Sequence, residues 1–181
     1  ASFGFSSTIE SLGAKAFLNA GLTGTTLDLS ACTKLTAIPE GCFYQIGSST
    51  GYQTVKLPTS IKTIGDNAFL NNKSLTTLDL SAMVNLETIS QFAFSGCSFT
   101  TLNLSNSTKL TYVGNAAFHN NAGLTIAYMP YNLTSYAAST FNTCPNLTAA
   151  YLSENLTEIC FAMFYSCTNL SKLGITQSDN Y

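Results

Sequence analysis

The single histidine, His119, and the six cysteines are the side chains best suited to chemistry in this sequence. A catalytic histidine needs an orienting partner and a nucleophile or water within reach. A zinc site needs three or four ligands. The cysteines form no Cys-x-x-Cys pair, which is the spacing typical of zinc sites and thiol–disulfide centres. They are Cys32, Cys42, Cys97, Cys144, Cys160 and Cys167.

Other signatures of enzymes are missing from the sequence. It contains no Gly-x-Ser-x-Gly, no His-Glu-x-x-His and no phosphate-binding glycine loop. The 9 acidic residues are scattered. Asp28 and Asp79 share an outward strand position described below, but Lys56 lies between them, so ion pairing or solvation is favoured over a glycosidase pair. We therefore predict that the chain is not an enzyme and holds no metal and no cofactor.

Composition favours one folded unit that binds neither nucleic acid nor a membrane interior. A chain of 181 residues with 45% hydrophobic content can build one continuous core, so we expect a single monomeric domain over residues 1–181. Only 7 residues are Lys or Arg and the net charge is -2, which leaves no basic stripe for phosphates. No apolar run approaches the roughly 18 residues of a membrane span. We expect any export signal to have been removed from this chain.

An internal period explains most of these residues. Seven segments that end in phenylalanine recur at spacings of 23 to 26 residues and tile the chain. A short alternating pair of apolar residues, such as Leu78 and Leu80, follows each phenylalanine, and this alternation predicts a short strand. The repeated phenylalanines are Phe17, Phe43, Phe69, Phe94, Phe118, Phe141 and Phe164.

The repeat resembles a known family. The pattern LxxIGxxAFxxN/CxxLxxLxL is clearest as IKTIGDNAFLNNKSLTTLDL at 61–80, and it is similar to the BspA-type (Treponema pallidum-type) leucine-rich repeats of bacterial and protist surface proteins. The resemblance covers nearly the whole chain. Three departures stand out: the second unit carries the bulge YQIGSSTGYQT at 44–54, the fourth is one residue short before Phe99, and strand positions 127 and 150 are alanine.

The resemblance implies an α/β repeat solenoid, namely a right-handed leucine-rich-repeat superhelix of seven repeats with a parallel sheet on its concave face. The physics of the pattern agrees, because one unit loses roughly 35 kcal/mol on ordering and its few buried side chains return far less. Stacked units share their faces. We expect each phenylalanine segment to form one short helical turn on the convex side.

The repeat gives His119 and the cysteines structural explanations. His119 directly follows a repeated phenylalanine, at a position that holds chemically unrelated residues in the other units. This variety predicts an incidental surface residue. Cys97, Cys144 and Cys167 occupy the Asn/Cys slot three residues after the phenylalanine, where a side chain can bond the turning backbone. Cys32 lies in a variable loop and is expected to be the most exposed. Free thiols are favoured over a bridge between stacked cysteines, whose parallel side chains rarely reach the required torsion.

The outward strand residues form the most informative surface. This row changes from charged residues to Tyr128 and Tyr151 along the chain, and adjacent members lie about 5 Å apart in a parallel sheet. Tyrosines concentrate in binding patches, so these two are the predicted ligand contacts, with Lys172 and Tyr52 as further candidates. The alternative, that both rings merely pack over small neighbours, stays open.

Two functions follow from these observations. The resemblance implies a cell-surface or secreted recognition or adhesion module that binds a host or cell-surface protein or glycan through the sheet face. The alternative is a structural spacer within a longer surface protein.

Overall fold

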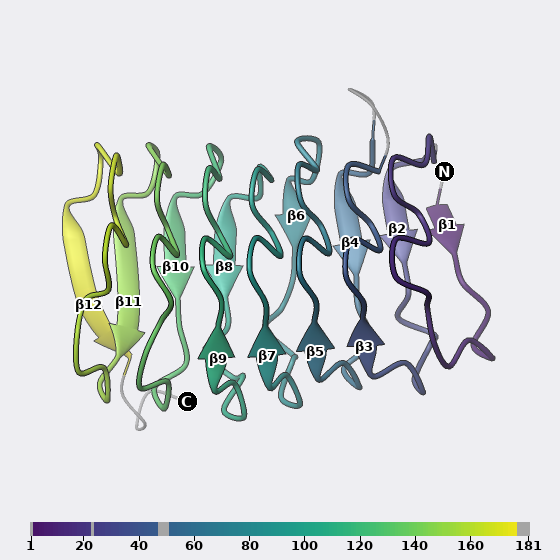
Figure 1. Cartoon of the computed structure of the whole chain (residues 1–181), viewed down its shortest axis with the longest axis horizontal. Coiled ribbons are helices and arrows are strands. Elements are labelled where there is room, and N and C mark those ends of the chain that lie inside the picture. The colour runs from purple at the N-terminus through teal and green to yellow at the C-terminus, as the bar shows by residue number, and fades with distance from the viewer. Residues whose placement is uncertain (1, 23, 47–50, 177–181) are drawn as a thin grey trace.

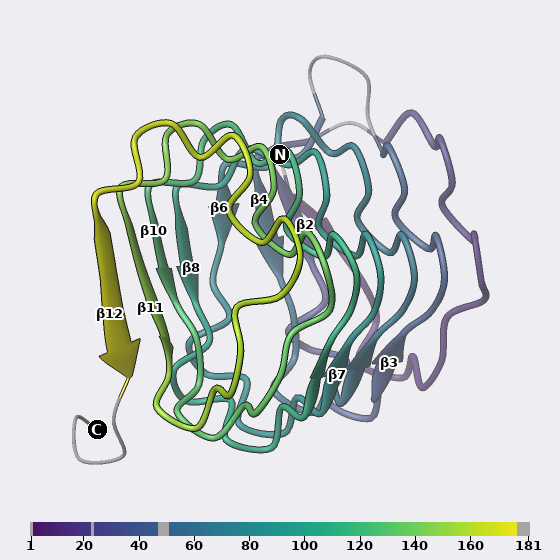
Figure 2. The same ribbon diagram turned by 60° about the vertical axis from the view of Figure 1, so that its left-hand side comes forward.

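The computed structural model, which describes residues 2–22, 24–46 and 51–176, is a solenoid of stacked turns with strands on two opposite sides (Figures 1 and 2). Each turn carries the chain once around a shared core. The strands are β1 (Ser2–Gly4), β2 (Thr26–Asp28), β3 (Ala37–Ile38), β4 (Thr54–Lys56), β5 (Thr63–Ile64), β6 (Thr77–Leu78), β7 (Thr88–Ile89), β8 (Thr101–Asn103), β9 (Tyr112–Val113), β10 (Ile126–Tyr128), β11 (Ala149–Ser153) and β12 (Lys172–Thr176).

The seven predicted strands, together with β1, which the repeat did not predict, build the first wall of the solenoid. They pair in parallel in two sheets, ordered β1-β2-β4-β6 and β8-β10-β11-β12. Equivalent repeat positions face one another, as Leu27 does Val55. The two sheets meet between β6 and β8. These two strands are in contact, but among the described residues they are not paired by backbone hydrogen bonds as strands of one sheet. This break coincides with the unit that is one residue short before the buried Phe99.

The second wall, on the opposite side of the core, was not predicted. It is a parallel sheet in the order β3-β5-β7-β9. Its inward residues, Ile38, Ile64, Ile89 and Val113, are at most 1% exposed. Each strand has only two residues, so alternation within it is too short to distinguish a strand from a turn.

The expected helical turns are wrong, because the described residues form no helix. Two residues in the left-handed region flank every repeated phenylalanine, and an α-helix of L-residues cannot continue through them. The backbone N–H groups bond the next turn instead: Phe69 N donates to Ala93 O at 2.8 Å. The fold is therefore a β-solenoid. The left-handed residues are Lys15, Asn19, Gly41, Gln45, Asn67, Asn71, Phe92, Gly96, Ala116, Asn120, Ser139, Thr143, Ala162 and Ser166.

The repeated phenylalanines form one continuous stack along the core. Successive ring centroids are 5.2 to 5.8 Å apart, with planes within 18° of parallel. The five inner rings are fully buried, whereas Phe17 and Phe164 at the ends are partly exposed. This confirms the phenylalanine slots read from the sequence. The right-handed sense of the superhelix and the concave position of the first wall stay predictions.

The part of the chain that the structure describes holds no helix with the length and apolar character needed to cross a membrane.

Candidate functional site

The structure brings Tyr128, Tyr151 and Lys172 together on the outer face of the first wall. Tyr128 of β10 and Tyr151 of β11 are register partners. Their ring centroids are 4.9 Å apart and their planes differ by 13°. The Lys172 ammonium lies 5.0 Å from the centroid of Tyr151, and its hydrogen bond with the Tyr151 side chain raises the pKa of Lys172. We call these three residues the tyrosine ladder.

Gly174 explains how the Tyr151 ring lies. Gly174 is the register partner of Tyr151 on β12. A Cβ added to Gly174 would lie 2.5 Å from the Tyr151 Cδ1. The glycine therefore leaves room for the ring to lean over β12, where Lys172 also covers it. Since Tyr128 covers the other face of this ring, Tyr151 presents mainly its edge and hydroxyl to a ligand.

The acidic residues at the charged end of the outward row stabilise the turns that follow their strands. Asp28 and Asp79 each accept hydrogen bonds through Oδ1 from the serine two residues later, at 2.9 Å from its backbone N and 2.6 Å from its Oγ. These bonds lower the pKa of both carboxyls. The Lys56 ammonium lies 3.8 Å from the Asp28 Oδ2, as expected of an ion pair. The sequence signal for the caps is Asp-Leu-Ser, a local turn motif that was missed.

Tyr52 does not join this surface. Its side chain is 2% exposed, and burial raises the pKa of its hydroxyl. The expectation of an exposed ligand contact at Tyr52 is therefore corrected, because the ring packs into the core. Residues 47–50 of the same bulge lie outside the described residues.

His119 is half-buried. Its Nδ1 lies 3.2 Å from the Oγ of Ser95, which occupies the same slot one turn earlier. Burial lowers the pKa of the imidazole. Within the described ranges no hydrogen bond joins an acidic residue to this ring, so the contact lacks the orienting partner of a catalytic pair.

The cysteines of the Asn/Cys slot bond the backbone as predicted. Each donates its thiol to the carbonyl of the repeated phenylalanine one turn earlier, as Asn72 does through its amide. Cys32 corrects the sequence prediction, because it is fully buried and donates to Ser6 O at 3.4 Å. The slot bonds are Cys97 to Phe69 at 3.3 Å, Cys144 to Phe118 at 3.3 Å and Cys167 to Phe141 at 3.0 Å.

All six thiols are unbridged. The hydrogen bond with the Cys167 side chain, together with burial, raises the pKa of Cys144. Over the described ranges, no three His, Cys, Asp or Glu side chains gather as they would around a metal ion.

Comparison with known proteins identifies the repeat. The BspA type leucine-rich repeat region matches residues 1–109 and 79–181, in six copies. The chain belongs to the BspA-type leucine-rich repeat family. This confirms the resemblance read from the sequence, and no catalytic family is indicated. No curated protein matches.

Two solved structures share the fold. The leucine-rich repeat protein of T. pallidum is 21% identical, with a TM-score of 0.65 over 96% of this chain and 68% of that one. A leucine-rich repeat protein from Bacteroides ovatus is 17% identical, with a TM-score of 0.51 over 96% of this chain and 60% of that one. This BspA-type chain thus spans only part of the length of both solved structures.

Proposed function

We propose that this BspA-type chain is a non-enzymatic recognition module, displayed at a cell surface or secreted, that binds a host or cell-surface protein or glycan through the first wall. Membership of the family supports a role in protein interaction. Extended solenoid walls offer broad binding surfaces. The observation that carries the proposal is the tyrosine ladder, where two stacked rings and a lysine lie side by side on the outer face.

The orientation of the rings favours a protein over a glycan. A sugar ring that packs on an aromatic side chain needs an open ring face, but both faces of Tyr151 are covered by Tyr128 on one side and by β12 on the other. The tyrosine hydroxyls instead suit hydrogen bonding to a polar partner surface such as polypeptide. Preorganised stacking also reduces the entropy lost when the rings bind.

The test begins with a pull-down from surface proteins and a glycan array, both using the purified chain. With the ligand so found, replacing Tyr128 and Tyr151 together with serine should weaken binding by at least about 2 kcal/mol, or roughly 30-fold in Kd. The matched control is Tyr112→Ser on β9, since this side chain is 51% exposed on the opposite wall. Binding by the control should equal that of the wild type.

A second variant tests whether binding depends on the position of the Tyr151 ring and not only on its presence. Gly174→Ala keeps both tyrosines but places a methyl group where the Tyr151 ring lies. We expect it to weaken binding as well. Unchanged binding by a folded double tyrosine variant would instead favour the alternative function, a structural spacer in a longer surface protein.

A further inference from the structure

The loop after β4 is shorter than the loops on either side of it. Residues 58–60 (PTS) follow β4, whereas residues 30–34 (SACTK) follow β2 and residues 81–85 (SAMVN) follow β6. Because adjacent strands lie about 4.8 Å apart, a recessed middle loop leaves roughly 10 Å between the two longer loops.

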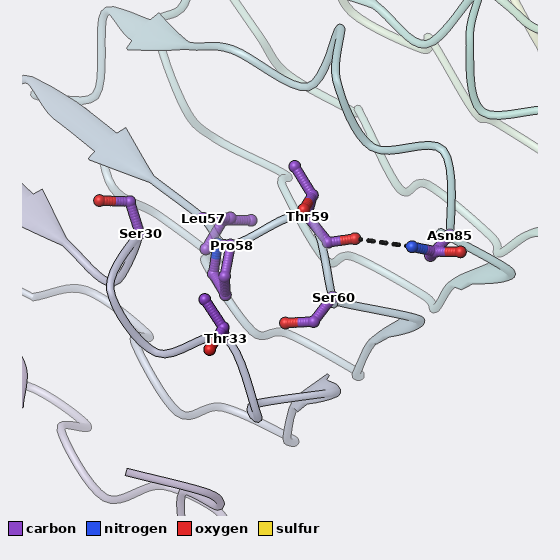
Figure 3. A pocket seen from close by; sticks show the side chains of 7 residues that line it. All are labelled: Ser30, Thr33, Leu57, Pro58, Thr59, Ser60 and Asn85. Carbon is purple, nitrogen blue, oxygen red and sulfur yellow. Dashed lines mark hydrogen bonds between the residues drawn. The ribbon is translucent and has the colours of Figure 1, made fainter. Parts of the chain in front are cut away.

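Two adjoining hollows occupy this gap. One of about 410 Å³ lies over the end of β4, and one of about 300 Å³ lies between residues 30–34 and Asn85 (Figure 3). Both are lined by Ser30, Leu57 and Thr59. We call them together the notch.

The notch has an apolar floor and polar walls. The floor consists of Leu57, which is half-buried, and of Pro58 and Met83, which are buried. The Asn85 amide donates to Thr59 O at 3.2 Å across one side, as Figure 3 shows. No aromatic side chain is among the lining residues. The shape and the floor therefore suit an unbranched aliphatic chain better than a flat ring.

The uncompensated charge at the notch is negative. Lys56 and Asp79 both line it, but Lys56 is paired with Asp28 on its other side. Asp79 has no ion-pair partner within the described ranges. Its Oδ1 takes both bonds from Ser81, which lower its pKa and keep it ionised at neutral pH. The second oxygen, Oδ2, is left to meet a cation.

We propose that the notch receives a lysine or arginine side chain of a protein partner, with its aliphatic stem over Leu57 and Met83 and its cationic head at the Asp79 carboxylate. These two side chains alone combine an apolar stem with a permanent positive charge. The ligand's positive charge would neutralise Asp79, the one carboxylate among the described residues that line the notch, although Lys56 lies nearby. This site is separate from the tyrosine ladder, because β6 and β8 lie between β4 and β10.

The test is an NMR titration of the whole ¹⁵N-labelled chain with the blocked peptide acetyl-Gly-Lys-Gly-amide. We expect saturable shifts at residues 57–59 and 79–83. The same peptide with norleucine in place of lysine keeps the stem and loses the charge, so it should bind about three- to fivefold more weakly, as expected for loss of one exposed ion pair. The glutamate peptide should not bind.

Three variants are expected to change the affinity for the lysine peptide in different ways. Asp79→Asn should weaken the lysine peptide by about three- to fivefold. It should keep its turn, since Asn103 accepts the equivalent bonds from Ser105 at 3.1 and 2.7 Å. Lys56→Gln removes the competing ammonium and should tighten binding. Asp66→Asn makes the same change of charge at a carboxylate bonded by Gln91, and should leave binding unchanged.

Several results would overturn the proposal. These are equal binding of the norleucine peptide, preference for the glutamate peptide, shifts centred on the tyrosine ladder, or no saturable shift at all. Damage to the fold would weaken binding by every variant, so it cannot imitate a loss in Asp79→Asn together with a gain in Lys56→Gln. If the peptide shifted only residues of the tyrosine ladder, the proposed recognition function would still hold, and only the proposed site in the notch would be refuted.

Discussion

Replacing Phe69 with alanine tests whether the phenylalanine stack holds the turns together. The ring is fully buried, and its centroid lies 5.4 Å from that of Phe43 and 5.2 Å from that of Phe94. A buried Phe→Ala change costs about 3 to 5 kcal/mol. Because two ring pairs are lost, each contributing about 0.5 to 1.5 kcal/mol, we expect the upper half of that range. For a domain of this size the melting temperature should fall by roughly 8 to 20 °C.

The assay is urea unfolding monitored by circular dichroism. Free energies of unfolding are compared with one common m-value, the slope of free energy against urea concentration. Phe161→Ala is the matched control, because the same side chain is removed where it is 84% exposed; it should cost less than about 0.5 kcal/mol. His119→Ala, at a half-buried residue whose ring is hydrogen-bonded to Ser95, should cost under about 1 kcal/mol. Equal losses for Phe69 and Phe161 would refute the assignment of the stack as the core.

Three further outcomes are expected. Thr143 is β-branched at a φ of 58°, so Thr143→Asn should raise the free energy of unfolding by up to about 1 kcal/mol in the same urea assay. The folded pKa values of Asp28 and Asp79 lie below the ordinary 3.8, so the stabilisation by these carboxylates is present above that pH and lost as pH falls through the folded values. The variant with both Asp28→Asn and Asp79→Asn should therefore lose less free energy of unfolding on acidification from pH 6. A thiol reagent should modify the partly exposed Cys160 first and reach Cys97, whose pKa burial raises to about 12, only on unfolding.

Much of the fold could be predicted because each unit repeats the same constraint. Seven phenylalanines in register identify the core, and the alternation in segments such as 78–80 identifies the first wall. The left-handed residues could not be predicted. They include Phe92, Ala116 and Ser139, which have no preference for that conformation, so only the stacking of neighbouring turns imposes it.

The candidate site was predicted in part for a similar reason. Period-2 alternation places Tyr128 and Tyr151 outward and in register whatever the rest of the turn does. Tyr52 follows an irregular loop where the period gives no guidance, and its burial depends on tertiary packing alone. The notch was also missed, although the lengths of the loops after β2, β4 and β6 already distinguish the middle one.

The most direct test of recognition through the first wall is hydroxyl-radical footprinting of the chain with and without the ligand found in the pull-down. Mass spectrometry reports the oxidation of each tyrosine. We predict that binding protects Tyr128 and Tyr151, while Tyr112 and Tyr165, which are 51% and 67% exposed, stay as reactive as in the free chain. Protection of Tyr112 or Tyr165 with undiminished oxidation of the ladder would contradict the account.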